Sequence, residues 1–159
     1  MIAVTDASPI CYLVLIGEVD LLASLSGRVV VPRRVLDELL DKGAPVAVRD
    51  WAAAPPDWIS IHDAPAAIPT GLERLHAGER AAILLAESVK ADLILLDEKY
   101  ARRVAAERGL RVTGVLGVLV EAANRGLVDL ALSIDKLRKT GFRGSPALLK
   151  AALDRFTMG

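Results

Sequence analysis

Cysteine and histidine are scarce in this chain of 159 residues. Cys11 is the only cysteine, so no disulfide can form within the chain. Two histidines and one cysteine are also too few for a zinc site built from these two residue types. Any metal ion would therefore have to be held by oxygen ligands.

Long hydrophobic runs are absent as well. The longest, residues 10–16 and 81–86, are far shorter than the roughly 18 residues that a membrane-spanning helix needs. The N-terminus has no basic flank, and Asp6 and Pro9 interrupt the apolar stretch that an export signal would require. We therefore expect a cytoplasmic protein with no membrane segment.

Overall charge of one sign is also missing, because 20 basic and 20 acidic residues balance. With 53% apolar residues, the length and composition predict a single globular domain over 1–159, with C-terminal helices at 129–157 packed on it. The charges are unevenly distributed: residues 1–97 have a net charge of −6 and residues 98–159 of +6. This asymmetry is either ordinary decoration of helix surfaces or a sign that the C-terminal third faces a polyanion.

Short β-branched or apolar runs alternate with helical patterns along the chain. The first helical stretch should have Ser8 as N-cap and Pro9 as its first residue, and a later helix should end at Gly43. Residues 44–70 read as an irregular excursion around one short strand. The alternation predicts an open, mostly parallel sheet with helices on both faces. The expected strands are residues 2–5, 28–32, 58–62, 93–96 and 111–113.

Two aspartates end strands of this predicted sheet, Asp6 after the first and Asp97 after the fourth. In parallel sheets, ligands bind beyond the carboxyl ends of the strands, so both would face one crevice, although each could instead cap the following helix. Glu38 borders the apolar stripe of its helix. Glu79 lies in the first turn of another helix, where it could simply complement the helix dipole. Glu98 is either a supporting group of such a site or a solvated first-turn acid.

Four converging carboxylates would repel one another unless a cation lay among them. An all-oxygen ligand set suits Mg²⁺ or Mn²⁺, and the chemistry that such a site supports best is phosphodiester hydrolysis. The sequence contains no phosphate-binding P-loop, no G-x-G-x-x-G fingerprint and no G-x-S-x-G nucleophile elbow.

Four segments in order, VTDASPICYLVLIGEVDLL, VPRRVLDEL, HAGERAAILLAE and LILLDEKYARRVAAERGLRVTGVLGVL, resemble the PIN-domain family. The likeness is to VapC-like ribonuclease toxins that open with D-A-S-P-[IL] and carry G-E-x-x-A-I. It implies a Rossmann-like, three-layer α/β/α PIN fold, Mg²⁺- or Mn²⁺-dependent cleavage of RNA, a homodimer, and a cognate antitoxin protein.

The resemblance also implies roles for particular residues. It places Asp6, Glu38, Glu79 and Asp97 in the acidic site, with Ser8 supporting the site and Arg102 or Arg103 binding phosphate. One departure is visible: many relatives of this type carry an aspartate as the third acid, where this chain has Arg80, and Glu79 lies one residue earlier.

The leading hypothesis is therefore an endoribonuclease in which Asp6, Glu38 and Asp97 hold the ion or ions and Glu79 orients the attacking water. A catalytically weak or inactive PIN-like module that binds RNA or protein is one alternative, and a DNA nuclease is another. Because aromatic residues make up only 4% of the chain, we expect RNA to be recognised through its backbone and shape. The helical stretches at 10–25 and 115–132 are apolar on more than one face, which fits core burial or a dimer or antitoxin interface.

Overall fold

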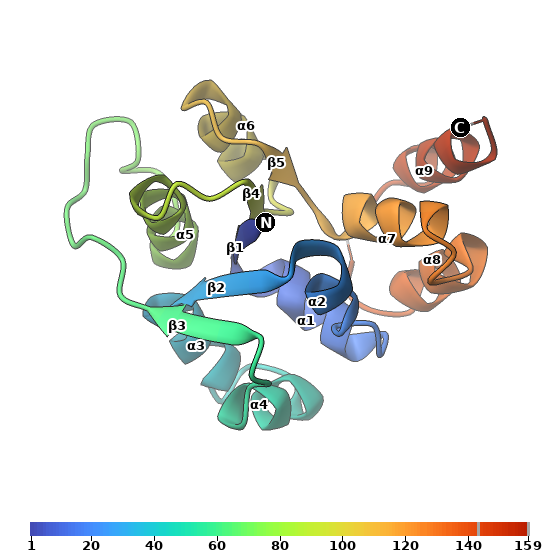
Figure 1. The fold of residues 1–159 in the computed structure, drawn as a ribbon, viewed down its shortest axis with the longest axis horizontal. Helices are drawn as coiled ribbons and strands as arrows, with labels where there is room; N and C mark the ends of the chain where they lie inside the picture. Colours follow the sequence, from blue (N-terminus) through green and yellow to red (C-terminus); the bar gives the residue numbers. More distant parts are fainter. Residues whose placement is uncertain (143, 159) are drawn as a thin grey trace.

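A central parallel sheet organises the molecule (Figure 1). The computed structural model describes the backbone of residues 1–142 and 144–158 and the side chains of residues 1–142 and 144–154. Neighbouring strands all pair in parallel, in the order β3-β2-β1-β4-β5. The strands are β1 (Ile2–Thr5), β2 (Arg28–Pro32), β3 (Ile59–His62), β4 (Leu93–Leu95) and β5 (Val112–Thr113).

The strand order defines where a ligand can reach the sheet. The chain builds outward from β1 through β2 to β3, then returns to the other side of β1 to form β4 and β5. The register pairs Ala3 with both Val29 and Leu93, so β1 lies between β2 and β4. In open parallel sheets, such a reversal creates a crevice beyond the carboxyl ends of the two strands that flank it. Here those strands are β1 and β4.

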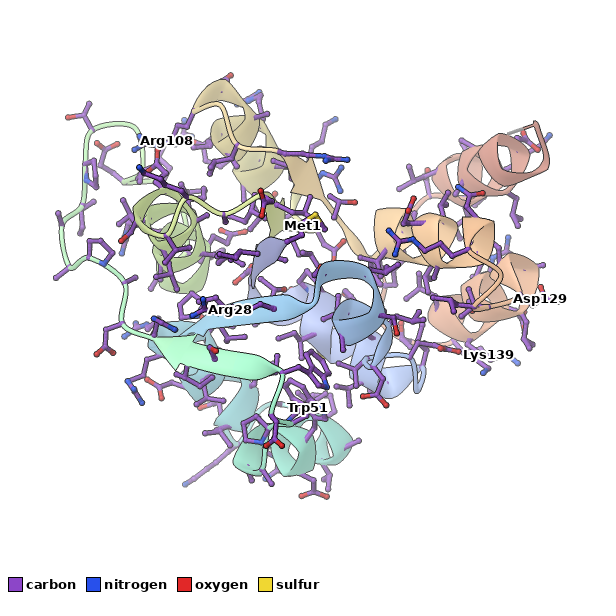
Figure 2. All side chains as sticks on the ribbon, in the orientation of Figure 1. Met1, Arg28, Trp51, Arg108, Asp129 and Lys139 are labelled. Atoms are coloured by element: carbon purple, nitrogen blue, oxygen red, sulfur yellow. The ribbon has the colours of Figure 1, made fainter. Side chains whose placement is uncertain are left out.

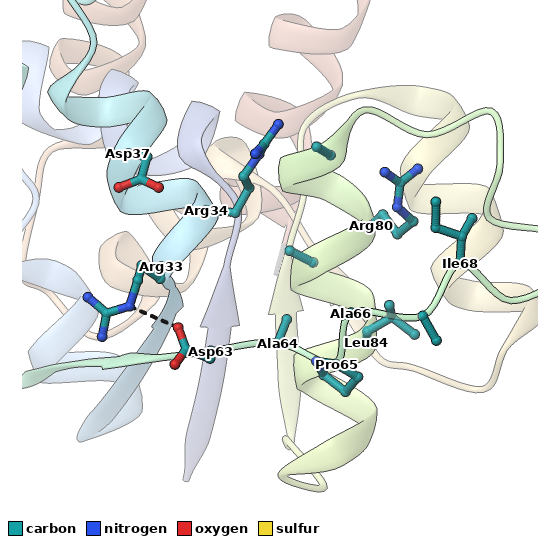
Figure 3. Close-up of a pocket in the computed structure, with 13 residues that line it drawn as sticks. Arg33, Arg34, Asp37, Asp63, Ala64, Pro65, Ala66, Ile68, Arg80 and Leu84 are labelled. Carbon is teal, nitrogen blue, oxygen red and sulfur yellow. Dashed lines mark hydrogen bonds and ion pairs between the residues drawn. The ribbon is translucent and has the colours of Figure 1, made fainter.

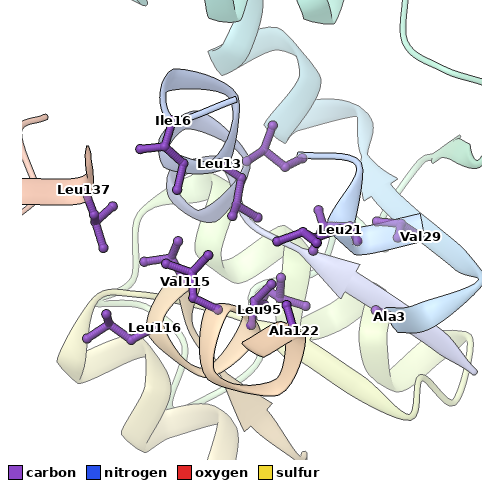
Figure 4. Packing of buried hydrophobic residues seen from close by; sticks show 14 of the residues in the cluster. Ala3, Leu13, Ile16, Leu21, Val29, Leu95, Val115, Leu116, Ala122 and Leu137 are labelled. Carbon is purple, nitrogen blue, oxygen red and sulfur yellow. The ribbon is translucent and has the colours of Figure 1, made fainter. Parts of the chain in front are cut away.

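Helices cover both faces of the sheet. Side chains alternate along each strand, so Val29 and Val31 contact one helical layer while Val30 contacts the other. The larger layer contains α1 to α4 and α7 to α9, and Figure 4 shows Leu13 and Val115 packed over the strand residue Leu95. The other layer is formed by α5 and α6. The helices are α1 (Ala7–Leu15), α2 (Leu21–Ser26), α3 (Arg33–Leu40), α4 (Val46–Ala53), α5 (Ala77–Ser88), α6 (Lys99–Glu107), α7 (Val115–Asn124), α8 (Leu130–Arg138) and α9 (Pro146–Met158).

The α/β/α architecture and the parallel sheet predicted from the sequence are confirmed, with each of the expected strands present. Short apolar runs identify these strands because both faces of the sheet are covered, as parallel sheets require. Charged side chains such as Arg108, Asp129 and Lys139 lie on the outside of the fold (Figure 2).

Two predicted helix boundaries were wrong. The first helix begins at Ala7, and Asp6, in an extended conformation, takes the N-cap position predicted for Ser8. Pro9 then lies within the first turn, where its missing N–H costs no hydrogen bond. The third helix ends at Leu40 instead of at Gly43, because Asp41 turns to an extended conformation and its carboxylate accepts a hydrogen bond of 2.9 Å from the Gly43 N–H.

The excursion at 44–70 contains a helix that the sequence analysis missed. Pro45 immediately precedes α4, and its fixed φ suits a helix start. Val48 and Ala52, four residues apart, bury the inner face of α4 against the larger layer. Two buried positions are too short a pattern to show a helical period.

The C-terminal helices α8 and α9 pack against α7, and Leu137, Leu149 and Ala152 belong to the same core as the sheet. The Ser145 hydroxyl accepts a hydrogen bond of 3.1 Å from the Leu148 N–H at the start of α9. No helix in the described part of the chain is both long and apolar enough to cross a membrane.

Candidate functional site

Asp6 and Asp97 follow neighbouring strands at the crevice between β1 and β4. Asp6 comes directly after Thr5, whose register partner is Leu95, and Asp97 lies two residues beyond Leu95. The Asp6 N–H donates a hydrogen bond of 3.1 Å to the Leu95 carbonyl, which extends the ladder to the edge of the sheet. The fold therefore brings together two acids that are 91 positions apart in the sequence.

Asp6 is buried, with only 7% of its surface exposed. Burial raises the pKa of its carboxyl to about 7, since a charge is poorly solvated there. The Ala7 backbone N–H opposes this shift, while the charges of Glu38, Glu79 and Asp97 add to it. The predicted acids thus lie close enough to interact electrostatically around Asp6.

Asp97 has one satisfied and one unsatisfied oxygen. Its Oδ1 accepts a hydrogen bond of 2.8 Å from the Val115 N–H, at the start of α7. Its Oδ2 is buried and is the one buried side-chain polar atom in the described part of the chain without a hydrogen-bond partner. Burial raises the pKa of Asp97, against the Val115 N–H and the Arg102 guanidinium, which lower it. A buried acceptor without a donor is a natural position for a cation.

Glu38 reaches the site from the middle of α3. The residue as a whole is exposed, but its carboxylate turns inward and lies against Gly78 in the first turn of α5, where no side chain occupies the space. Desolvation of this end raises the pKa of Glu38; Arg34 opposes the shift and Glu79 adds to it.

Glu79 is buried, with 6% of its surface exposed, and its Oε1 accepts a hydrogen bond of 3.1 Å from the His76 N–H. It is the third helical residue of α5, so it forms a capping box with His76. Burial raises the pKa of Glu79, and the charge of Glu98 adds to that shift. The Glu79 carboxylate therefore caps the start of α5, a structural role other than the complement to the helix dipole considered from the sequence.

A family model described as a PIN domain, DUF3368, matches residues 2–158. The chain belongs to the PIN-domain family. Among solved structures, it is similar to a PilT N-terminus domain protein from the hyperthermophilic archaeon Sulfolobus solfataricus P2, with a TM-score of 0.56 and 17% identity over 77% of this chain and 93% of that chain. At this identity, the similarity shows a shared fold. No curated protein gave a significant sequence match.

PIN domains are generally nucleases that use divalent metal ions. The donor set at the carboxyl edge of this PIN domain consists of carboxylate oxygens, and Oδ2 of Asp97 accepts no hydrogen bond in the described part of the chain. Within the described residues, no three His, Cys, Asp or Glu side chains are already close enough to ligate one ion together. Mg²⁺ usually keeps several of its waters and binds through one or two carboxylates, so Asp6 and Asp97 fit such an ion without a complete protein cage.

The remaining predicted residues lie in different surroundings. Ser8 is exposed in the first turn of α1. Glu98 is the N-cap of α6, where its Oε2 accepts a hydrogen bond of 2.9 Å from the Ala101 N–H. Arg102 lies beside Asp97 and donates a 3.4 Å hydrogen bond to the Leu96 carbonyl. Arg103, one residue on, turns away and lies over the Tyr100 ring, 5.3 Å from its centroid. Arg102 is therefore the arginine of the pair that reaches the site.

Sequence reasoning missed Arg34 and His76, whose electrostatic interactions with Glu38 lower the pKa of its carboxyl. Arg34 is four residues before Glu38 on the same helix, a spacing that brings side chains together and could have identified it. The signal for His76 was its place three residues before Glu79, the capping-box spacing, although histidine is an unusual first member.

Proposed function

We propose that this PIN domain is a divalent-metal-dependent endoribonuclease with its active site at the carboxyl ends of β1 and β4. The observation that carries the proposal is the meeting of acids at that edge: the charges of Glu38, Glu79 and Asp97 all act on Asp6, and Asp97 keeps a buried oxygen that accepts no hydrogen bond within the described residues. Such an arrangement is costly for a protein whose site holds no cation. The arrangement of these acids is therefore better explained by ion binding than by a contribution to the stability of the fold.

Asp6, Glu38 and Asp97 would hold Mg²⁺ or Mn²⁺. When bound, such an ion polarises the phosphoryl oxygen and stabilises the leaving oxygen. The Val115 N–H keeps Asp97 oriented at the edge of the sheet. Glu79, held by its bond to the His76 N–H, would orient the attacking water through its other oxygen. Arg102 would contact the phosphate beside Asp97.

A second candidate is a PIN-fold module that binds RNA or protein without cutting. The observation in its favour is that no ready-made metal cage exists among the described side chains. The two candidates differ in metal affinity. Millimolar Mn²⁺ should raise the melting temperature of the nuclease, because an ion that binds only the folded state stabilises it, and should leave that of a pure binding module unchanged.

The direct experiment is cleavage of a fluorescently labelled structured RNA, and of a DNA of the same sequence, with Mn²⁺, with Mg²⁺ and with EDTA. We expect metal-dependent cutting of the RNA by the wild type and none by Asp6→Asn. Asp50→Asn, a change of the same kind at an exposed residue of α4, should cut like the wild type. Equal cutting by Asp6→Asn would mean that another nuclease is responsible. Cutting of the DNA but not of the RNA would mean that the substrate is DNA.

The proposed partners are a second copy of the chain and an antitoxin protein, as in toxin–antitoxin pairs. Leu127, Leu132 and Leu148 are each about half exposed around α8 and α9, with 48%, 54% and 48% of their surfaces accessible, so this end offers apolar surface for a partner. Light scattering on the purified protein tests the dimer: a mass near twice 16.9 kDa supports it, and a mass near 16.9 kDa rejects it.

A further inference from the structure

A groove of about 410 Å³ runs between α3 and α5 and is bordered by the segment 63–68 (Figure 3). Arg34 of α3 and Arg80 of α5 line it from its two helical walls. Much of the remaining lining consists of alanines, including Ala77 and Ala81, so an incoming chain can approach the helices closely.

The charged residues of the groove differ in whether they are paired. Arg33 is neutralised by Asp63, with its Nε 2.8 Å from the carboxylate. Neither Arg34 nor Arg80 forms an ion pair within 4.0 Å in the described part of the chain. A 3.3 Å hydrogen bond to the Leu75 carbonyl steadies the guanidinium of Arg80. Asp37 is the remaining charge of the lining, which leaves the groove positive.

Residues of the acidic site are neighbours, along the two helices, of residues that line the groove. Arg34 precedes Glu38 by one helical turn, and Arg80 directly follows Glu79. The two helices meet where the Glu38 carboxylate lies against Gly78, next to the lining residue Ala77. A chain that leaves the carboxylates between α3 and α5 would therefore pass the two arginines.

We propose that this groove binds the sugar–phosphate backbone of the RNA strand next to the phosphodiester that is cut, with Arg34 and Arg80 on its phosphates. The inference rests on the proposed nuclease function and names how that site holds its substrate. A volume in the range of small-molecule clefts accommodates one or two nucleotides of a single strand. Guanidinium groups suit phosphate because their donors match its oxygens in pairs.

This proposal places RNA binding on residues of the N-terminal, net acidic part of the chain. From the sequence, the C-terminal third, with a net charge of +6, was the candidate for facing a polyanion, whereas Arg34 and Arg80 belong to residues 1–97, with a net charge of −6. A net charge summed over residues 1–97 hides these two arginines, because that segment has 14 acidic residues against 8 basic ones.

The test measures binding without cutting, so every variant is made in the Asp6→Asn background. Fluorescence anisotropy with a labelled single-stranded RNA, in EDTA and over a series of salt concentrations, gives the dissociation constant. The test variant carries Arg34→Ala and Arg80→Ala. The matched control carries Arg28→Ala and Arg138→Ala, which remove two exposed arginines away from the groove. Melting temperatures show that each variant is folded.

We expect the Arg34/Arg80 variant to bind about tenfold or more weakly than the control. The slope of log K against log salt should fall in magnitude by about 1.4, because each phosphate contact on a single strand contributes about 0.7. Asp37→Asn should tighten binding, since it removes the acid that opposes the arginines. A test variant that binds RNA like the control, or an Asp37→Asn variant that binds RNA more weakly, would overturn the proposal that the groove binds the RNA backbone.

The experiments distinguish a wrong role for the groove from a wrong nuclease function. If the wild type cuts RNA and the Arg34→Ala/Arg80→Ala variant cuts and binds RNA equally well, the proposed nuclease function is supported and the proposed role of the groove is wrong. If the wild type neither cuts nor binds RNA, while an acidic peptide binds and loses affinity in the same double variant, the groove serves a protein ligand and the proposal is wrong.

Discussion

The carboxylate of Glu38 fills the space beside Gly78 that a side chain at position 78 would need. One acid of the site is thus positioned by the absence of a side chain on the facing helix. The contact joins α3 to the first turn of α5, next to Glu79.

Gly78→Ala should displace Glu38 without unfolding the protein. The new Cβ would overlap the carboxylate and force it away, whereas alanine itself suits a helix better than glycine. We expect Mn²⁺ affinity to fall by about 10-fold to 100-fold, as for other groups that orient metal ligands. Titration calorimetry measures the affinity. Gly141→Ala is the control, since a Cβ there would meet nothing within 4 Å, and equal Mn²⁺ affinity for the two variants would contradict the positioning role.

Asp97→Asn should preserve the fold and abolish ion binding. The amide oxygen can still accept from the Val115 N–H, and the substitution removes a charge that burial disfavours. We expect an unchanged or higher melting temperature in EDTA and no rise on addition of Mn²⁺. Asp92→Asn is the matched control, because Asp92 also accepts a backbone bond, 2.7 Å from the Ile2 nitrogen, but is exposed away from the site. A normal Mn²⁺ response of Asp97→Asn would remove this residue from the site.

The stability of the metal-free protein should fall as pH rises from about 4 to about 7. Burial raises the pKa of Asp6 to about 7, above the value of about 4 that it has in the unfolded chain, so within this window the folded state holds a proton that the unfolded state has lost. Each step up in pH therefore favours unfolding. Denaturant titrations in EDTA at pH 5 and pH 8 measure the difference, and Asp6→Asn should reduce it.

Glu38, Glu79 and Asp97 also have raised pKa values, so part of the pH dependence should persist in Asp6→Asn. Asp50→Asn should keep the full dependence of the wild type. If Asp6→Asn and Asp50→Asn lose stability equally between the two pH values, Asp6 does not carry the proton.

Two substitutions of Glu79 separate its structural role from its role in the reaction. Glu79→Gln keeps an oxygen that can accept from the His76 N–H, so the cap and the melting temperature should be preserved. Glu79→Ala loses the cap, which costs about 1 kcal/mol, or roughly 2–4 °C for a protein of this size. Single-turnover RNA cleavage should fall in both variants. Full activity of Glu79→Gln would restrict Glu79 to the capping box.

The sequence predicted those parts of the fold that depend on local pattern. Val29, Val30 and Val31 form an unbroken apolar run because the sheet is covered on both faces, and such runs identify parallel strands. Asp6 and Asp97 were visible as candidates because each ends such a run, and parallel strands place their carboxyl ends along one edge.

The features that the sequence did not predict depend on helix phase and on loop path. Successive helical residues point about 100° apart, so Arg102 reaches Asp97 while Arg103 lies over Tyr100. The two residues are alike in sequence, and only the packing of α6 separates them. The groove beside Arg34 and Arg80 requires the path of 63–68, which has no regular structure and no periodicity to read.

Anomalous X-ray diffraction from crystals of the wild type soaked in Mn²⁺ is the most direct measurement, because it locates the ion itself. We predict a manganese peak at the carboxyl ends of β1 and β4, in contact with the carboxylates of Asp6 and Asp97, and no such peak in Asp6→Asn crystals treated in the same way. A wild-type crystal with no manganese at these carboxylates, or with manganese bound only elsewhere, would contradict the proposed metal centre.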